Sequence, residues 1–155
     1  MKFYRVMRLL MAAALLTVCA CGKPEPEQPA VQEPEEIRLT VWGPQEQQTF
    51  LQERMDALSA EHGDETITIR IETESENTVR DTVLTAPERA ADVFLIREAD
   101  GKVLREAGLL LAYEDGSFLR DTGRTAGEGE ALFAAVNAGT SKPEWAREAA
   151  AAFGE

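Results

Sequence analysis

The sequence predicts an α/β fold in which helices flank a small parallel β-sheet. Three stretches have the apolar patterns of strands, at 37–42, 66–72 and 92–96, and a stretch with helical spacing follows each of them. This β-α-β-α-β-α order favours parallel strands that are joined by right-handed crossovers. The chain has 155 residues, of which 44% are hydrophobic and 28% charged, and this composition is typical of one globular domain.

In the first predicted strand, 37–42, apolar side chains alternate with others, and the Gly43-Pro44 pair ends it. A helix is predicted at 45–61, because Pro44 suits a first helical turn and Gly63 suits the position after a last one. The apolar positions that recur there at helical spacing are Leu51, Met55 and Leu58.

The second predicted strand, 66–72, alternates in the same way, and Pro87 stops the short helix that follows it. The third strand, 92–96, is a continuous apolar run, as expected of a strand that is covered on both faces. Another short helix is predicted at 103–107, and Gly108 ends it.

The C-terminal part is predicted to lack strands. Residues 114–130 are rich in Gly, Asp, Glu and Thr, so we expect a loop there. Residues 131–155 have helical apolar spacing, and we expect C-terminal helices whose Trp145 and Phe153 pack against the sheet. The folded lobe is therefore expected at 37–113.

The N-terminus is predicted to be a lipoprotein signal peptide at 1–20. Basic residues precede an apolar run at 9–18, which is too short to span about 30 Å of hydrocarbon. Val18 and Ala20 stand three places and one place before Cys21, as in the bacterial lipobox. We therefore expect acylation of Cys21, with chains such as palmitate, after cleavage of the signal.

Two alternatives to acylation stay open: a plain secretory signal with an incidental cysteine, or a disulfide that joins Cys19 to Cys21 or to another chain. Acylation makes the lipid bilayer a partner and places the protein on the extracytoplasmic face of the cell membrane. Residues 21–36 are rich in Pro and Glu, so we expect an extended, solvated tether there.

The chain is strongly acidic, with 16 basic and 28 acidic residues and a formal net charge of −12. Removal of 1–20 takes away three basic residues and no acidic ones, which leaves 13 against 28, or −15. Such a surface attracts neither nucleic acid nor an anionic bilayer, so no nucleic-acid partner is expected.

The order and spacing of several stretches resemble a bacterial extracellular solute-binding protein of family 1, the maltose-binding-protein-like family. They are the lipobox and tether, LTVWGPQEQ at 39–47, ADVFLI at 91–96 and LREAGLLLAY at 104–113. The resemblance implies the N-terminal lobe of a periplasmic-binding-protein type II fold. Because a second lobe has no counterpart here, we expect a truncated or internally deleted member.

The resemblance implies a non-enzymatic substrate-binding lipoprotein of an ABC-type carbohydrate importer. Its partners would be a carbohydrate, maltose or malto-oligosaccharide-like, and the importer's permease subunits. In the family, sugar contacts on two lobes favour a closed state, and with one lobe that closure is not expected. The alternative function is an acidic surface lipoprotein that acts as a protein-interaction module without sugar binding and uses an exposed apolar patch.

Ligands of open α/β sheets meet the loops at the carboxyl ends of the strands. This rule selects eight candidate ligand-binding residues: Trp42, Gly43, Pro44, Gln45 and Glu46 after the first strand, and Arg97, Glu98 and Asp100 after the third. Trp42 is either a platform for a sugar ring or a core aromatic. Gln45 and Glu46 either bind hydroxyls or form a solvated first helical turn, which we favour.

The second loop departs from the pattern of the resembling family. The family places an aromatic residue at the end of the strand, where this chain has Ile96. The family also has an acid shortly after the strand, and in this chain that acid, Asp100, comes one position later. The departure weakens a sugar contact there, and Arg97 with Glu98 is interpreted as a surface ion pair of little energy.

No catalytic residue, metal site or cofactor is predicted, because the sequence has no nucleophile motif, metal-ligand spacing or phosphate loop. His62 is interpreted as a partner of a helix C-terminus rather than as a catalyst. For Glu72, Glu74 and Glu76, an exposed loop face is favoured over a weak divalent-cation site.

Overall fold

The computed structural model describes residues 36–63, 67–127 and 129–154. The chain divides into two units, Met1–Glu33 and Pro34–Glu155, and all described residues belong to the second. The predicted signal peptide, the acylated Cys21 and the tether up to residue 35 lie outside the described residues. Within the described part, no helix has the length and apolar character needed to cross a membrane.

A five-stranded sheet forms the centre of this unit, in the order β2-β1-β3-β5-β4. The strands are β1 (Ile37–Gly43), β2 (Ile67–Thr73), β3 (Val93–Arg97), β4 (Arg120–Thr125) and β5 (Ala131–Val136). Strand β1 pairs in parallel with β2 on one side and with β3 on the other. The predicted parallel arrangement of these three strands is therefore confirmed.

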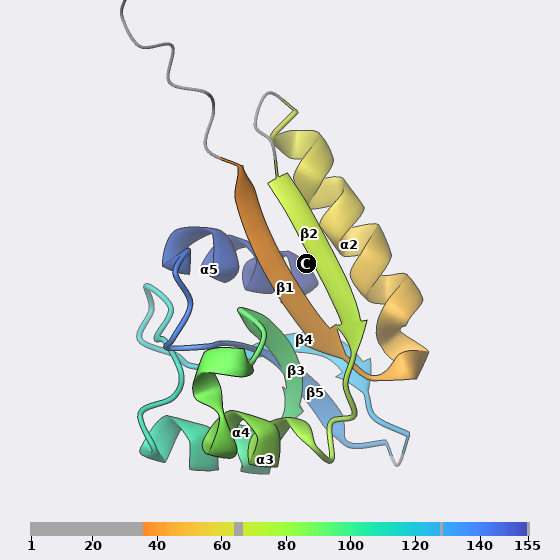
Figure 1. The fold of residues 1–155 in the computed structure, drawn as a ribbon. Coiled ribbons are helices and arrows are strands. Elements are labelled where there is room, and N and C mark those ends of the chain that lie inside the picture. Colours follow the sequence, from red (N-terminus) through yellow and green to blue (C-terminus); the bar gives the residue numbers. More distant parts are fainter. Residues whose placement is uncertain (1–35, 64–66, 128, 155) are drawn as a thin grey trace, which may run out of the picture. The chain divides into compact units, whose positions relative to one another are not determined.

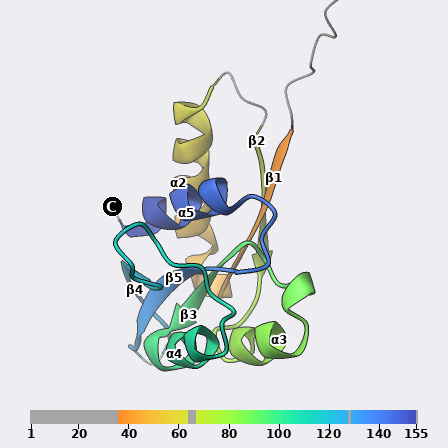
Figure 2. The same ribbon diagram turned by 90° about the vertical axis from the view of Figure 1, so that its left-hand side faces the viewer.

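Helices cover both faces of the sheet (Figures 1 and 2). The α2 and α5 helices lie on one face, and α3 and α4 lie on the other. The helical elements are η1 (Gln45–Gln47), α2 (Gln48–Glu61), α3 (Val79–Thr85), η2 (Pro87–Arg89), α4 (Glu98–Glu106), α5 (Pro143–Ala151) and η3 (Ala152–Gly154). The fold is thus α/β with flanking helices, as predicted.

Two apolar cores follow from the alternation of side chains along the strands. The α2-side core joins Leu39 and Val41 of β1 to Leu51 of α2 and to Phe153, which is fully buried. The α3-side core joins Phe94 of β3 to residues of α3 and α4. All apolar residues of β3 are buried, as its continuous apolar run predicts.

The prediction of a loop at 114–130 and of helix from 131 is wrong in part, because β4 and β5 are strands. Strand β5 runs antiparallel to β3, so the sheet is mixed rather than wholly parallel. The Leu and Ala residues of β5 favour helix locally. They form a strand because they are buried by the helices that cover the two faces of the sheet. Strand β4 is polar because it lies at the sheet's edge, where Thr122 Oγ1 donates to the Leu132 carbonyl at 2.7 Å.

Gly43 allows α2 to pack closely on the end of β1. A Cβ atom at this position would lie 2.5 Å from Leu51 Cδ1 and 3.4 Å from Leu95 Cδ1, and both leucines are fully buried. Any larger residue must therefore displace the α2-side core.

We predict that Gly43→Ala lowers the free energy of unfolding by about 1–3 kcal/mol, because it overpacks the core. Urea unfolding followed by circular dichroism measures the change. Gly63→Ala is the matched control, since the nearest heavy atom to its new Cβ lies at 3.7 Å. Equal stability of the two variants would contradict the packing argument.

Candidate functional site

The carboxyl ends of β2, β1 and β3 lie along one edge of the sheet, because the three strands are parallel (Figure 1). The start of β5 meets the same edge, since Arg97 pairs with Leu132 in the antiparallel ladder. We call this the carboxyl edge. Ligands of open α/β sheets bind at such an edge, so we expect a ligand site there.

A hollow of about 480 Å³ opens at the carboxyl edge, between the end of β3, the start of α4 and the start of β5. We call it the edge hollow. Its volume lies in the usual range for small-ligand sites. The residues that line it are Arg97, Glu98, Ala99, Asp100, Glu130, Ala131 and Phe133. All three residues predicted after the third strand therefore come together in one hollow.

Arg97 is the cation of the edge hollow. Its Nη2 donates to Glu76 Oε1 at 3.1 Å, and its Nε lies 2.7 Å from Glu130 Oε2. The Arg97 side chain is only 20% exposed, and the Glu76 side chain 10%. The predicted surface pair of Arg97 with Glu98 is therefore wrong, because the acids beside Arg97 come from elsewhere in the chain.

The two other predicted acids differ in how they are held. Asp100 Oδ1 accepts a hydrogen bond from Arg80 Nη1 at 2.8 Å, and its side chain is 16% exposed. Glu98 Oε1 lies 2.8 Å from Lys102 Nζ, one helical turn further along, and both groups are well exposed. Asp100 is thus fixed in the wall of the edge hollow, whereas Glu98 is free to reorient toward a ligand.

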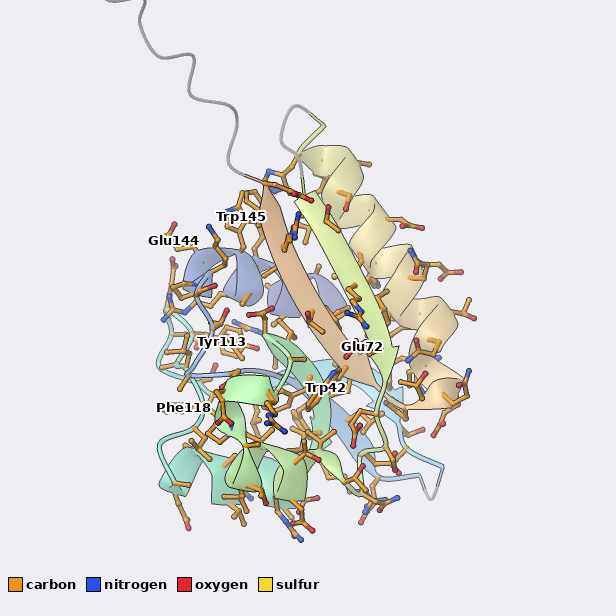
Figure 3. The ribbon with its side chains drawn as sticks, viewed as in Figure 1. Trp42, Glu72, Tyr113, Phe118, Glu144 and Trp145 are labelled. Carbon is orange, nitrogen blue, oxygen red and sulfur yellow. The ribbon has the colours of Figure 1, made fainter. Side chains whose placement is uncertain are left out.

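The residues predicted after the first strand do not line the edge hollow. Trp42 is 8% exposed and belongs to the α3-side core, and its Nε1 donates to Glu72 Oε2 at 2.9 Å (Figure 3). The core alternative for Trp42 therefore holds, because little of the indole is left for a ligand.

The rest of this first loop has a structural role. Gly43 and Pro44 are buried, and the Gly43 carbonyl accepts hydrogen bonds from Glu74 N and Gln48 Nε2. Gln45 and Glu46 are exposed in the 3-10 turn η1, as the favoured alternative predicts.

The prediction of an exposed acidic loop at 72–76 is wrong for two of its three glutamates. Glu76 is buried and pairs with Arg97. Glu72 belongs to β2 and binds Trp42 and Arg70. Within the described ranges, no group of three His, Cys, Asp or Glu residues is placed to hold a metal ion.

Sequence reasoning missed the side chains that complete the edge hollow, which are Glu130 and Phe133. Both stand in the region predicted as loop and helix, so nothing local placed them beside β3. If ALFAAV at 131–136 is interpreted as a strand with alternating side chains, Phe133 lies on one face of that strand. This apolar run is the sequence signal that could have placed Phe133.

His62 does not line the edge hollow. His62 follows α2, and its Nε2 lies 2.7 Å from Glu148 Oε1 of α5, while its ring makes an edge contact with Trp145.

The interaction-module alternative requires a contiguous apolar patch. Among described residues, the large apolar side chains that stay exposed are Leu84 of α3 and Val103 of α4, each at 42%.

The lining of the edge hollow suits a neutral ligand with several hydroxyl groups. The carboxylates of Glu98, Asp100 and Glu130 accept hydrogen bonds, and the guanidinium of Arg97 donates them. Phe133 adds an aromatic side chain, which packs on the apolar face of a ring. With the ion-pair partners Glu76, Arg80 and Lys102 included, four acids stand against three bases, and this excess of negative charge disfavours an anionic ligand.

No family model matches the chain, and no curated protein matches it. Among the solved structures that are similar to it are the following two. One, solved with acarbose, has a TM-score of 0.47 and 21% identity, over 63% of this chain and 29% of that chain. The other is the maltodextrin binding protein MalE1 from L. casei BL23 without ligand, with a TM-score of 0.44 and 16% identity, over 51% of this chain and 21% of that one. The chain therefore spans less than a third of either protein.

We predict that Arg97→Met lowers the free energy of unfolding by about 1–3 kcal/mol, because it leaves the buried Glu76 carboxylate without a cation. The double variant Arg97→Met/Glu76→Gln should lose less than the sum of the two single variants, since they share one interaction. Thermal unfolding of the four proteins measures this coupling.

Arg38→Met is the matched control, because the Arg38 side chain is 76% exposed and its pair with Glu36 faces solvent. Its cost should be about 0–1 kcal/mol. If Arg38→Met and Arg97→Met cost the same, the buried pair does not stabilise the carboxyl edge.

Proposed function

We propose that this chain is the lipid-anchored, extracytoplasmic sugar-binding component of an ABC-type carbohydrate importer, and that the edge hollow holds a sugar unit. The observation that carries this proposal is the lining of the edge hollow, where one guanidinium, three carboxylates and one phenyl ring converge between the end of β3, the start of α4 and the start of β5. The protein acts by binding and not by catalysis.

A carbohydrate is the ligand class that uses all of these groups together. Each sugar hydroxyl both donates and accepts, so it satisfies carboxylates and a guanidinium in the same site. The C–H face of a pyranose ring packs on an aromatic side chain such as Phe133. Because the acids outnumber the bases, a neutral sugar such as maltose or a malto-oligosaccharide is preferred to a sugar acid.

The anchor and the tether supply the remaining parts of the proposal. Acylation of Cys21 keeps the protein at the bilayer, and the acidic, proline-rich stretch at 21–36 holds the folded unit away from the surface. The anchor and the tether together bring the bound sugar to the importer's permease subunits in that membrane. The resemblance of 39–47, 91–96 and 104–113 to sugar-binding importer lipoproteins supports this assignment.

Isothermal titration calorimetry of the full chain, in a detergent without a sugar headgroup, tests the proposal with maltose and maltotriose. We expect saturable binding of both. Gluconate, which has the hydroxyls of a sugar but carries a negative charge, should not bind.

Glu98→Ala should weaken sugar binding about tenfold, the cost of losing a hydrogen bond to a charged group. Glu106→Ala is the matched control, because Glu106 is exposed on the same helix but does not line the edge hollow. If the folded protein binds no sugar, or if the two variants lose equal affinity for sugar, the assignment is contradicted and the interaction-module alternative is favoured.

A further inference from the structure

Among the residues that the structure describes, β2 pairs with β1 alone, so β2 is an edge strand of the sheet (Figure 1). The Glu74 N–H that follows it donates to the Gly43 carbonyl at 3.0 Å, so the backbone groups of the even-numbered residues point toward β1. Backbone groups alternate in direction along a strand, and those of Ile67, Ile69, Ile71 and Thr73 therefore point outward. This row of donors and acceptors is available to another strand.

The exposed face of β2 has a charge pattern that is complementary to itself. Arg70 and Glu72 stand two residues apart on the same face, and Arg70 Nη2 lies 2.7 Å from Glu72 Oε1. The Arg70 side chain is 75% exposed and the Glu72 side chain 34%. The opposite face of β2 is covered, because Ile69 and Ile71 pack against the α2-side core.

An antiparallel pairing of two β2 strands, centred on Ile71, uses both the outward backbone groups and the charge pattern of β2. Ile71 then lies opposite Ile71 of the second copy, and the two residues exchange both of their outward hydrogen bonds. Arg70 lies opposite Glu72 of the second copy, and Glu72 lies opposite its Arg70. These two cross-strand pairs fall at the close, non-hydrogen-bonded positions, where opposite charges stabilise the pairing.

We propose that a second copy of this chain binds along β2, so that the two sheets form one continuous sheet about a two-fold axis through Ile71. The interface is isologous, and each copy places its cation opposite the anion of the other copy and its anion opposite the cation. A basic peptide finds only Glu72 and an acidic peptide only Arg70, whereas a second copy satisfies both. The edge hollow stays open in this dimer, because β1 separates β2 from β3 and β5.

Sedimentation velocity of the full chain in detergent tests the proposal, with the detergent's contribution subtracted from the mass. We expect twice the protein mass of one chain, and this mass should fall on dilution. Arg70→Glu and Glu72→Arg should each lower the association constant about tenfold or more, because each makes both cross-strand pairs repulsive. Arg38→Glu is the matched control, since it makes the same charge change on the neighbouring strand β1, and it should leave the dimer intact.

Mixing the two variants gives the sharpest test. Each variant repels itself, but the Arg70→Glu chain and the Glu72→Arg chain attract each other at both pairs. A tagged Arg70→Glu chain should therefore retain untagged Glu72→Arg and not untagged Arg70→Glu. Circular dichroism checks that both variants fold, because Glu72→Arg also removes the acceptor of Trp42 Nε1. A monomeric wild-type chain, a dimeric Arg70→Glu chain or failure of the mixed pair to associate would overturn the proposal.

Discussion

The pairing of β1 with strands on both of its sides is the constraint on which the rest of this structure depends. Only Val41 and Trp42 pair with β3 in the regular ladder, and Asp92 extends the contact. Its N–H donates to the Thr40 carbonyl at 3.0 Å, and its Oδ2 accepts from Thr40 N at 2.8 Å. Its Oδ1 accepts from Thr140 Oγ1, so one carboxylate joins the centre of the sheet to the segment before α5. Loss of this register would displace β3, and the carboxyl end of β3 is part of the candidate site.

The parallel half of the sheet could be predicted from the sequence because its signals are local. Alternation at 37–42 and the continuous run at 92–96 each specify a strand and its burial, and the helices between them require crossovers. Strand β5 could not be recognised in the same way. ALFAAV is compatible with either period, and only its pairing with β3 decides between them. The polar strand β4 is a strand because β5 is one.

The candidate site could likewise be predicted only where its sequence signals are local. Arg97, Glu98 and Asp100 were predictable because they directly follow a buried strand at the edge where ligands bind. Trp42 follows the same rule, yet its side chain faces α3 and is buried. The partners of Arg97 were not predictable, because Glu76 and Glu130 approach from two distant segments. A single acid in a polar stretch gives no sign that it will neutralise a half-buried guanidinium.

The position of β5 between β3 and β4 also determines the order in which the fold is completed. Val93 pairs with Val136, so the β3 ladder closes only after the chain has been made almost to α5. A nascent chain that has emerged as far as α4 leaves one side of an apolar strand without hydrogen-bond partners, and such strands aggregate. Folding that begins only after release of the whole polypeptide avoids this intermediate, because β5 is then present to compete for β3 from the start.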